Sequence, residues 1–364
     1  MKKKIIIFMP SIEGGGVEKN VFIVSNYLAK KFNGISLITI SKKYKSKFNK
    51  LVDVKTLSSY FWDNLPRRFK YFLALSLLIF ELIKDRNKIV FSFQANIYCI
   101  IICKLLSIKV IVRSNSAPFG WSKNPFKKKL YKFFLKKADD IMVNSLEFKK
   151  DMKREFNVDS SCIYNPLNTK EILKLSKKRT KKNFNKKKNL KILNIGRFTE
   201  QKDQITFIKS LKIIQNRINF EAIIVGKGIL KDKLKENIIK LNLSKNVKLV
   251  NFLKNPYPTI NQSDLIVLTS RYEGLPNVLL EGIVLKKFII SSDCRTGPRE
   301  ILNNGRGGFL FKVGDYKNLA KKIVMFKKNR RRCDQMIKIS YKNLVRFNME
   351  NNLKKYSNFI SKHM

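Results

Sequence analysis

Histidine is almost absent from this sequence of 364 residues, since His363 is the only one. Cysteine occurs five times, an odd number, and no two cysteines form a Cys-x-x-Cys pair. These absences argue against a zinc site and against Ser-His or Cys-His catalysis. The odd number of cysteines also indicates a reducing compartment, because exported proteins usually pair their cysteines in disulfides.

Acidic residues are scarce relative to basic ones. The 77 Lys and Arg exceed the 26 Asp and Glu by a formal net charge of +51. Such a charge attracts nucleic acid, anionic lipid or a polyanionic substrate. A second explanation stays open, because the chain is crowded with Lys, Asn and Ile, the residues that an AT-rich coding sequence produces.

Long uninterrupted apolar runs are also missing. Residues 71–80 are apolar except for Ser76, and two lysines and a serine interrupt residues 97–112. A membrane-spanning helix needs about 18 apolar residues, so we expect two buried helices. The alternative for the first is a helix in the headgroup layer of an anionic membrane, in which residues 69–80 dock together with the basic residues around their start. These are Arg67, Arg68 and Lys70.

Short apolar runs alternate with helical patterns, which is typical of parallel sheets covered by helices. The first series has expected strands at 4–9, 35–40, 52–57, 89–93, 110–112 and 141–143. The second has expected strands at 191–195, 221–225, 247–251, 265–269 and 288–292. The sequence therefore predicts an α/β protein with two Rossmann-like domains, whose parallel sheets face each other across a ligand-binding cleft.

The expected domains span residues 1–168 and 191–336. Between them, half of the residues from 170 to 191 are basic, and Glu171 is the one acidic residue among them. This composition predicts an exposed basic linker at 169–190. The last segment, 337–364, has a helical pattern and is a candidate to pack across both domains.

The densest pattern lies at 269–282, where an apolar strand is followed by a turn and an apolar helix. The amides and positive dipole at the start of that helix favour a phosphate. Glu273 precedes the turn and Glu281 lies within the helix, so both would contact one ligand, and sugar hydroxyls suit carboxylates beside a phosphate. Two solvent-facing carboxylates are the alternative. The turn consists of Gly274, Leu275, Pro276 and Asn277.

A second pattern begins at Gly196, at the end of an expected strand. Arg197 follows directly, and Lys202 comes five residues later, before a helix. Glycine lets a ligand approach the backbone, and the two cations could hold a diphosphate, the arginine through its fork of donors and the lysine as a compact charge.

Two further glycine loops follow strands. Gly226 ends the next strand, where the alternative is a simple connecting turn, and Gly14, Gly15 and Gly16 precede the helix that carries Glu18. Backbone amides in such loops can contact a phosphate or a sugar. The pattern is not Gly-x-Gly-x-x-Gly, which gives a dinucleotide site little support. The chain also lacks Asp-x-Asp, so we expect no metal, with the diphosphate neutralised by the basic residues and helix amides.

These motifs together resemble glycosyltransferase family 4, a family of retaining enzymes with two Rossmann-like domains (GT-B architecture). The resemblance covers nearly the whole chain and is strongest over 197–300, including Ser292-Asp-Cys-Arg-Thr-Gly-Pro-Arg-Glu300. In particular, it is similar to the branch that extends lipid-linked oligosaccharides and O-antigen or capsule repeats.

The resemblance implies a nucleotide-sugar donor, usually a UDP-sugar, and no further cofactor. Arg197 and Lys202 would bind the diphosphate, Glu273 would contact the donor hexose and Glu281 would hold the ribose hydroxyls. The amides of the 274–277 turn would contribute, and Gly196 and Gly226 would complete the donor site.

The acceptor would enter near Gly15 and Gly16. Many relatives carry a histidine in the first domain beside the reacting sugar, and none occurs here before His363. Candidates for its place are Arg113, Asn115, Gln94 and Asn96.

The implied reaction transfers a hexose or N-acetylhexosamine, with retained configuration, to a lipid-linked or glycan acceptor. The start of the chain has too short an apolar run for a signal peptide, so we expect a cytoplasmic enzyme, peripheral at the inner face of the cell membrane on its anionic surface.

One rival function is that of a UDP-N-acetylglucosamine 2-epimerase. Another is a nucleic-acid-binding protein, but the basic residues are spread along the chain without a recognition pattern, so we expect no nucleic-acid partner.

Overall fold

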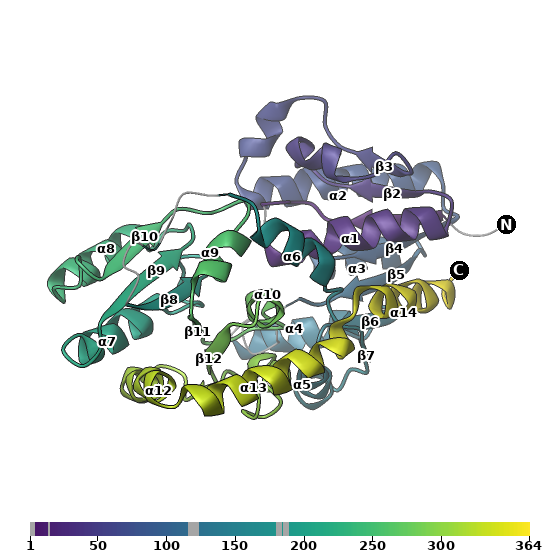
Figure 1. Cartoon of the computed structure of the whole chain (residues 1–364). Helices are drawn as coiled ribbons and strands as arrows, with labels where there is room; N and C mark the ends of the chain where they lie inside the picture. Colours follow the sequence, from purple (N-terminus) through teal and green to yellow (C-terminus); the bar gives the residue numbers. More distant parts are fainter. Residues whose placement is uncertain (1–3, 14, 116–123, 180–183, 185–188) are drawn as a thin grey trace. The chain divides into compact units, whose positions relative to one another are not determined.

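The computed structural model describes residues 4–13, 15–115, 124–179, 184 and 189–364, and it divides into two compact units (Figure 1). The first unit comprises residues 1–166 together with 349–364, and the second comprises 167–348. Each contains one parallel sheet with helices against it. The expected α/β fold with two Rossmann-like domains is confirmed.

The sheet of the first unit has seven strands in the order β3-β2-β1-β4-β5-β6-β7. Its strands are β1 (Lys4–Phe8), β2 (Ile35–Ile38), β3 (Val52–Lys55), β4 (Lys88–Ser92), β5 (Lys109–Arg113), β6 (Asp140–Val143) and β7 (Ser161–Cys162). Its helices are α1 (Gly16–Lys31), α2 (Arg67–Lys84), α3 (Asn96–Leu105), α4 (Pro125–Leu135), α5 (Leu146–Phe156) and α14 (Met349–Ser361).

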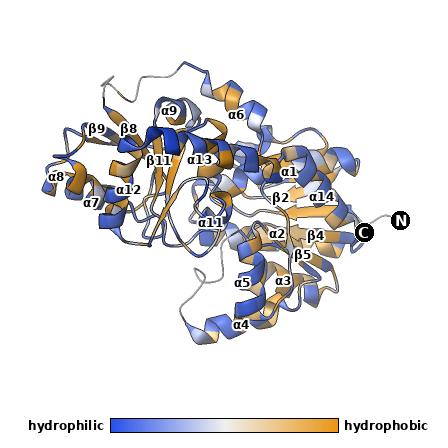
Figure 2. Cartoon of the chain, turned by 60° about the horizontal axis from the view of Figure 1, so that its bottom comes forward, coloured by the Kyte–Doolittle hydropathy of each residue, from blue (hydrophilic) through white to orange (hydrophobic). Residues whose placement is uncertain are grey.

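Helices bury both faces of this sheet, which explains why its strands read as continuous apolar runs. Alternate side chains of β1 point to opposite faces: Ile5 and Ile7 pack with α1 and α14, whereas Ile6 and Phe8 pack with α2, α3 and α5. The strands of both sheets are accordingly mostly hydrophobic, and the surrounding helices mix hydrophobic and hydrophilic residues (Figure 2).

The first apolar stretch lies within α2, and the second forms α3 and most of β5. No helix in the described part of the chain has the length and hydrophobicity that a membrane span requires. One face of α2 is buried, but Phe69 and Phe72 on the other face are exposed. Lys70 lies on the buried face, where its Nζ donates to the Asp63 carbonyl at 2.7 Å. The expected role of Lys70 in lipid docking is therefore wrong, because its ammonium group is already buried and bonded.

The end of the chain differs from the single helix expected at 337–364. A short 3-10 helix at Asn343–Phe347 separates α13 (Arg330–Lys342) from α14, since asparagine at 343 and at 348 favours helix ends over helix interiors. The first unit alone includes α14, which buries Tyr356, Phe359 and Ile360 in its core.

Arg113 connects α14 to the sheet of the first unit. Its fully buried guanidinium donates from Nε to the Tyr356 hydroxyl at 2.8 Å and from Nη2 to Asn165 Oδ1 at 2.5 Å. Its Nη1 donates to Asn115 Oδ1. Burial raises the pKa of Tyr356, so its hydroxyl stays protonated and accepts this bond. Neutral oxygens thus satisfy a charge that would be costly to leave unpaired.

The sheet of the second unit has six strands in the order β10-β9-β8-β11-β12-β13. Its strands are β8 (Leu190–Ile195), β9 (Phe220–Val225), β10 (Val247–Val250), β11 (Leu265–Leu268), β12 (Phe288–Ser292) and β13 (Phe309–Phe311). Its helices are α6 (Thr169–Ser176), α7 (Gln204–Ile214), α8 (Lys231–Lys240), α9 (Tyr257–Gln262), α10 (Asn277–Val284), α11 (Pro298–Ile301), α12 (Tyr316–Lys328) and α13.

The expected basic linker at 169–190 is wrong in its first part, because α6 occupies 169–176. Asn168 caps this helix through its Oδ1, which accepts from the amide of Glu171 at 3.0 Å. Ile172 and Ser176 are buried, and α6 packs against α9. The buried face of α6, rather than the high charge of the segment, makes residues 169–176 helical. Residues 180–183 and 185–188 lie outside the described residues.

Replacing Tyr356 with Phe removes one acceptor from the buried Arg113 guanidinium. We expect the variant to lose about 1.5–3 kcal/mol of unfolding free energy, the range for hydrogen bonds to charged groups. Urea unfolding followed by circular dichroism measures this loss. Tyr98→Phe, at an exposed position of α3 in the same unit, serves as the control and should change little. Equal effects at the two positions would contradict the role of Arg113.

Candidate functional site

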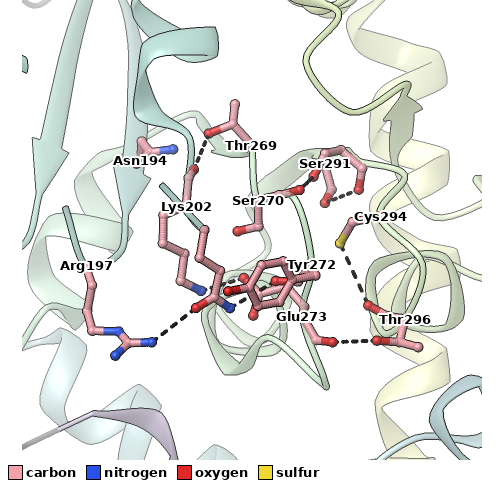
Figure 3. A network of polar contacts seen from close by, with 12 residues as sticks. Asn194, Arg197, Lys202, Thr269, Ser270, Tyr272, Glu273, Ser291, Cys294 and Thr296 are labelled. Atoms are coloured by element: carbon pink, nitrogen blue, oxygen red, sulfur yellow. Dashed lines mark hydrogen bonds and ion pairs between the residues drawn. The ribbon is translucent and has the colours of Figure 1, made fainter. Parts of the chain in front are cut away.

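The two motifs of the second unit meet at the carboxyl ends of β8 and β11. These strands are neighbours, with Ile192 paired to Leu265 and Leu193 to Ile266. Parallel strands end at the same edge of a sheet, so the loop after Ile195 and the loop after Leu268 lie together (Figure 3).

Lys202 and Glu273 form an ion pair between these loops. The distance from Lys202 Nζ to Glu273 Oε1 is 2.5 Å, and the two side chains are 16% and 8% exposed. The residues that the sequence analysis assigned to the diphosphate and to the donor sugar are thus in direct contact. Each ammonium carries three donors, so Lys202 can bind this carboxylate and still donate to a further anion.

Arg197 is exposed and lies beside the same loops. Its Nη2 donates to Gln201 Oε1 at 3.2 Å, and Gln201 Nε2 donates to the Tyr272 carbonyl at 3.0 Å. Gln204 Nε2 donates to the Arg197 carbonyl at 3.0 Å. Neither glutamine was predicted as a site residue, and the only signal for either is its position: Gln201 lies in the loop between Gly196 and α7, and Gln204 is the first residue of α7.

Helix α10 begins at Asn277, the last residue of the turn, with Pro276 at its cap position. Glu281 is buried on its second turn, where its Oε1 accepts from the Tyr257 hydroxyl at 3.2 Å. Glu273 is equally buried, so the alternative of two solvent-facing carboxylates is wrong. Tyr257 was not predicted as a site residue, because nothing in the sequence around it marks it as a partner of Glu281.

Close packing fixes two of the predicted glycines. A Cβ atom at Gly226 would lie 2.0 Å from the Gly196 carbonyl oxygen, and one at Gly196 would lie 3.2 Å from Lys202 Cγ. Gly226 thus supports the Gly196 turn from the next strand. The 274–277 turn is supported in the same way by Gly297, which has a φ of +91° and where a Cβ would lie 2.4 Å from the Gly274 oxygen.

In the first unit, Gly15 caps α1 and Gly16 begins it, whereas Gly14 lies outside the described residues. A Cβ at Gly15 would lie 2.7 Å from Oε2 of the buried Glu18, so the loop and this carboxyl group pack closely. Burial raises the pKa of Glu18.

The four candidates for the missing histidine all lie at the ends of β4 and β5. Gln94 Oε1 accepts from the Ser11 amide at 3.3 Å, and Asn96 Nδ2 donates to the Arg113 carbonyl at 3.1 Å. Asn115 Nδ2 donates to the Phe93 carbonyl at 2.8 Å. Arg113 has no exposed surface, so its place beside a reacting sugar is ruled out.

Gly226→Ala should cost about 3 kcal/mol or more of unfolding free energy, because its methyl group must displace the Gly196 backbone. Gly314→Ala is the matched control. Gly314 also follows a strand and has a φ of +79°, but nothing lies within 4 Å of its Cβ position. Its cost should be about 1–2 kcal/mol from backbone strain alone. Thermal unfolding of both variants tests this, and equal losses would contradict the packing role of Gly226.

Relatives of known sequence are glycosyltransferases. The chain is 26% identical over 326 residues to an N-acetylgalactosamine-N,N'-diacetylbacillosaminyl-diphospho-undecaprenol 4-alpha-N-acetylgalactosaminyltransferase of Campylobacter jejuni, covering 85% of this chain and 86% of that protein. It is 40% identical over 178 residues to an uncharacterized glycosyltransferase of Methanocaldococcus jannaschii. That second match spans 47% of this chain and 44% of the relative.

Solved structures share the fold. HepE of Anabaena in complex with UDP has a TM-score of 0.79 at 17% identity, and 99% of this chain and 100% of that chain are covered. The sucrose-phosphate synthase of Thermosynechococcus elongatus has a TM-score of 0.80 at 15% identity, with 99% and 98% covered. The fold is therefore the GT-B fold.

Two glycosyltransferase family models match the two halves of the chain. Residues 14–171 match Glycosyltransferase Family 4, and residues 176–343 match Glycosyl transferases group 1. The relatives named above carry glycosyltransferase names, one of them for the extension of a lipid-linked sugar. The chain therefore belongs to the group 1 glycosyltransferases of family 4, enzymes that transfer sugars in polysaccharide or glycoconjugate synthesis.

Proposed function

We propose that this glycosyltransferase moves a hexose or N-acetylhexosamine from a UDP-sugar to a lipid-linked glycan, with retention of the anomeric configuration. One observation carries the proposal: Arg197, Lys202, Glu273 and the start of α10 converge at one edge of the second sheet. Cations for a diphosphate and carboxylates for sugar hydroxyls are thereby adjacent.

In this proposal Arg197 and Lys202 bind the donor diphosphate, and the amides of the 274–277 turn complete its site. Negative charge grows on the diphosphate as its bond to the sugar breaks. Cations that are already fixed in place stabilise that charge without reorganisation. The chain lacks Asp-x-Asp, so we propose that the reaction proceeds without a metal ion.

The buried carboxylates select the sugars on either side of the diphosphate. Glu281, oriented by Tyr257, accepts hydrogen bonds from the ribose hydroxyls, and Glu273 accepts them from the donor hexose. The departing diphosphate takes the proton of the acceptor hydroxyl on the same face, so no protein nucleophile is required. Names of relatives support the acceptor class, because the Campylobacter jejuni enzyme acts on a diphospho-undecaprenol-linked sugar.

The test is incubation with a panel of radiolabelled UDP-sugars and a lipid extract, with and without a chelator. We expect one sugar to enter the lipid fraction at an unchanged rate when the chelator is present. Turnover of the donor without an acceptor would favour an epimerase instead. Binding to nucleic acid that ignores UDP would favour the second rival.

The same assay separates the residue roles. Glu281→Ala should raise the donor KM by about tenfold or more, because a buried acceptor for the ribose hydroxyls is lost. Glu236→Ala, on the exposed face of α8, is the control and should match the wild type. Wild-type donor kinetics in Glu281→Ala would contradict the assignment.

We also propose that the first unit docks on an anionic membrane at the inner face of the cell membrane. Large apolar side chains of α2 and α4 point into solvent, among them Phe72 (69% exposed), Phe80 (64%) and Phe126 (73%). Helix α3 packs against both of these helices. Basic residues flank the apolar ones, namely Arg67, Arg68, Lys127, Lys129 and Lys132. This combination suits a headgroup layer of negative charge.

Vesicle sedimentation at low salt measures this docking. The wild type should bind vesicles with anionic lipid and leave neutral vesicles unbound. The double variant Phe72→Ser, Phe80→Ser should bind anionic vesicles about tenfold or more weakly, because about 25 cal/mol of binding free energy is lost per Å² of apolar contact. Ile229→Ser is the control, because Ile229 is 90% exposed in the second unit. Equal partitioning onto the two vesicle types would argue against the proposal.

A further inference from the structure

Two fully buried threonines bond to the backbone of the Lys202 and Glu273 ion pair. Thr269 Oγ1 donates to the Lys202 carbonyl at 2.9 Å, and Thr296 Oγ1 donates to the Glu273 carbonyl at 2.5 Å. Each member of the pair therefore has its own backbone anchor. In Figure 3 the two hydroxyls approach the pair from separate loops.

Both carbonyls belong to loops, where no sheet ladder fixes the backbone. Lys202 directly precedes Asp203, which has a left-handed backbone at φ 43° and ψ 51° and caps α7. Glu273 directly precedes Gly274, whose carbonyl oxygen is approached closely by Gly297. A small rotation at either position would move the charged end of a long side chain by an ångström or more.

The anchors pass from strand to strand across the sheet edge. The loop after β12 supplies Thr296 for the loop after β11, and the loop after β11 supplies Thr269 for the loop after β8. Ser292 adds a further bond in the same direction, because its Oγ donates to the Ser270 carbonyl at 2.7 Å. Hydroxyls at or after the end of one strand thus hold the backbone of the loop after the neighbouring strand.

We infer that Thr269 and Thr296 are positioning residues with separable tasks, an inference that rests on the proposed function. Thr269 holds Lys202 for the diphosphate, and Thr296 holds Glu273 for the transferred sugar. Neither threonine touches the ligand itself. Misplacement of a reacting or binding group by about 1 Å can cost on the order of a hundredfold in rate, so loss of either anchor is measurable.

The experiment compares Thr269→Val with Thr296→Val, which replace each hydroxyl by a methyl group of similar size. UDP affinity is measured by calorimetry, and kcat and donor KM are measured by sugar transfer. Thr269→Val should weaken UDP binding about tenfold. Thr296→Val should leave UDP affinity within about twofold and lower kcat about tenfold, because Glu273 contacts the sugar and not the nucleotide.

Three controls make the result interpretable. Thr269→Ser and Thr296→Ser keep the hydroxyl and should restore wild-type values. Ser291→Ala removes a buried hydroxyl of β12 whose one bond among the described residues goes to the carbonyl of Ser292, so it should leave UDP affinity and kcat unchanged. If either valine variant fails to fold, the cysteine variant replaces it, since a thiol keeps the size but donates weakly.

Opposite results overturn the inference. If both threonine variants lose thermal stability but keep wild-type kcat and UDP affinity, the hydroxyls only stabilise the fold. If both variants change the same parameter, the tasks are not separate. A wild-type protein that does not bind UDP would instead contradict the proposed function, which keeps the two failures distinguishable.

Discussion

The ion pair between Lys202 and Glu273 is the interaction on which the candidate site of the second unit depends. Removing two charges from water is costly, and their attraction compensates only when the geometry is well defined and the remaining polar groups are bonded. The surrounding loops meet this requirement, because Thr269 and Thr296 fix the backbones of the pair and Gly226 supports the neighbouring turn. Much of the sequence of these loops therefore positions the side chains of Lys202 and Glu273.

Parallel strands explain why residues about 70 positions apart come together. In both units the polar residues follow the carboxyl ends of the central strands: Gln94 and Asn115 after β4 and β5, and Arg197 and Glu273 after β8 and β11. The apolar strands supply rigidity, and the loops supply chemistry. In the first unit, the fully buried Arg113 guanidinium is bonded instead to neutral oxygens.

The sequence predicted those features that depend on local pattern. Apolar runs located the central strands of both sheets, and glycines after two of those strands located the loops that carry Lys202 and Glu273. Neutral partners such as Gln201, Tyr257 and Thr296 were missed, because their contacts are set by strand order rather than by neighbours in the chain. Predictions from charge were wrong at two places. The expected linker begins as helix α6, which Ile172 anchors, and Lys70 is buried rather than exposed for lipid docking.

The return of α14 to the first unit has a consequence for how the protein is made. This helix follows the whole second unit in the chain, yet it covers the first sheet with Tyr356, Phe359 and Ile360. During synthesis the ribosome must release the entire second unit before the first can complete its core. Until then, the part of this sheet face that α1 leaves uncovered stays exposed to chaperones and to aggregation.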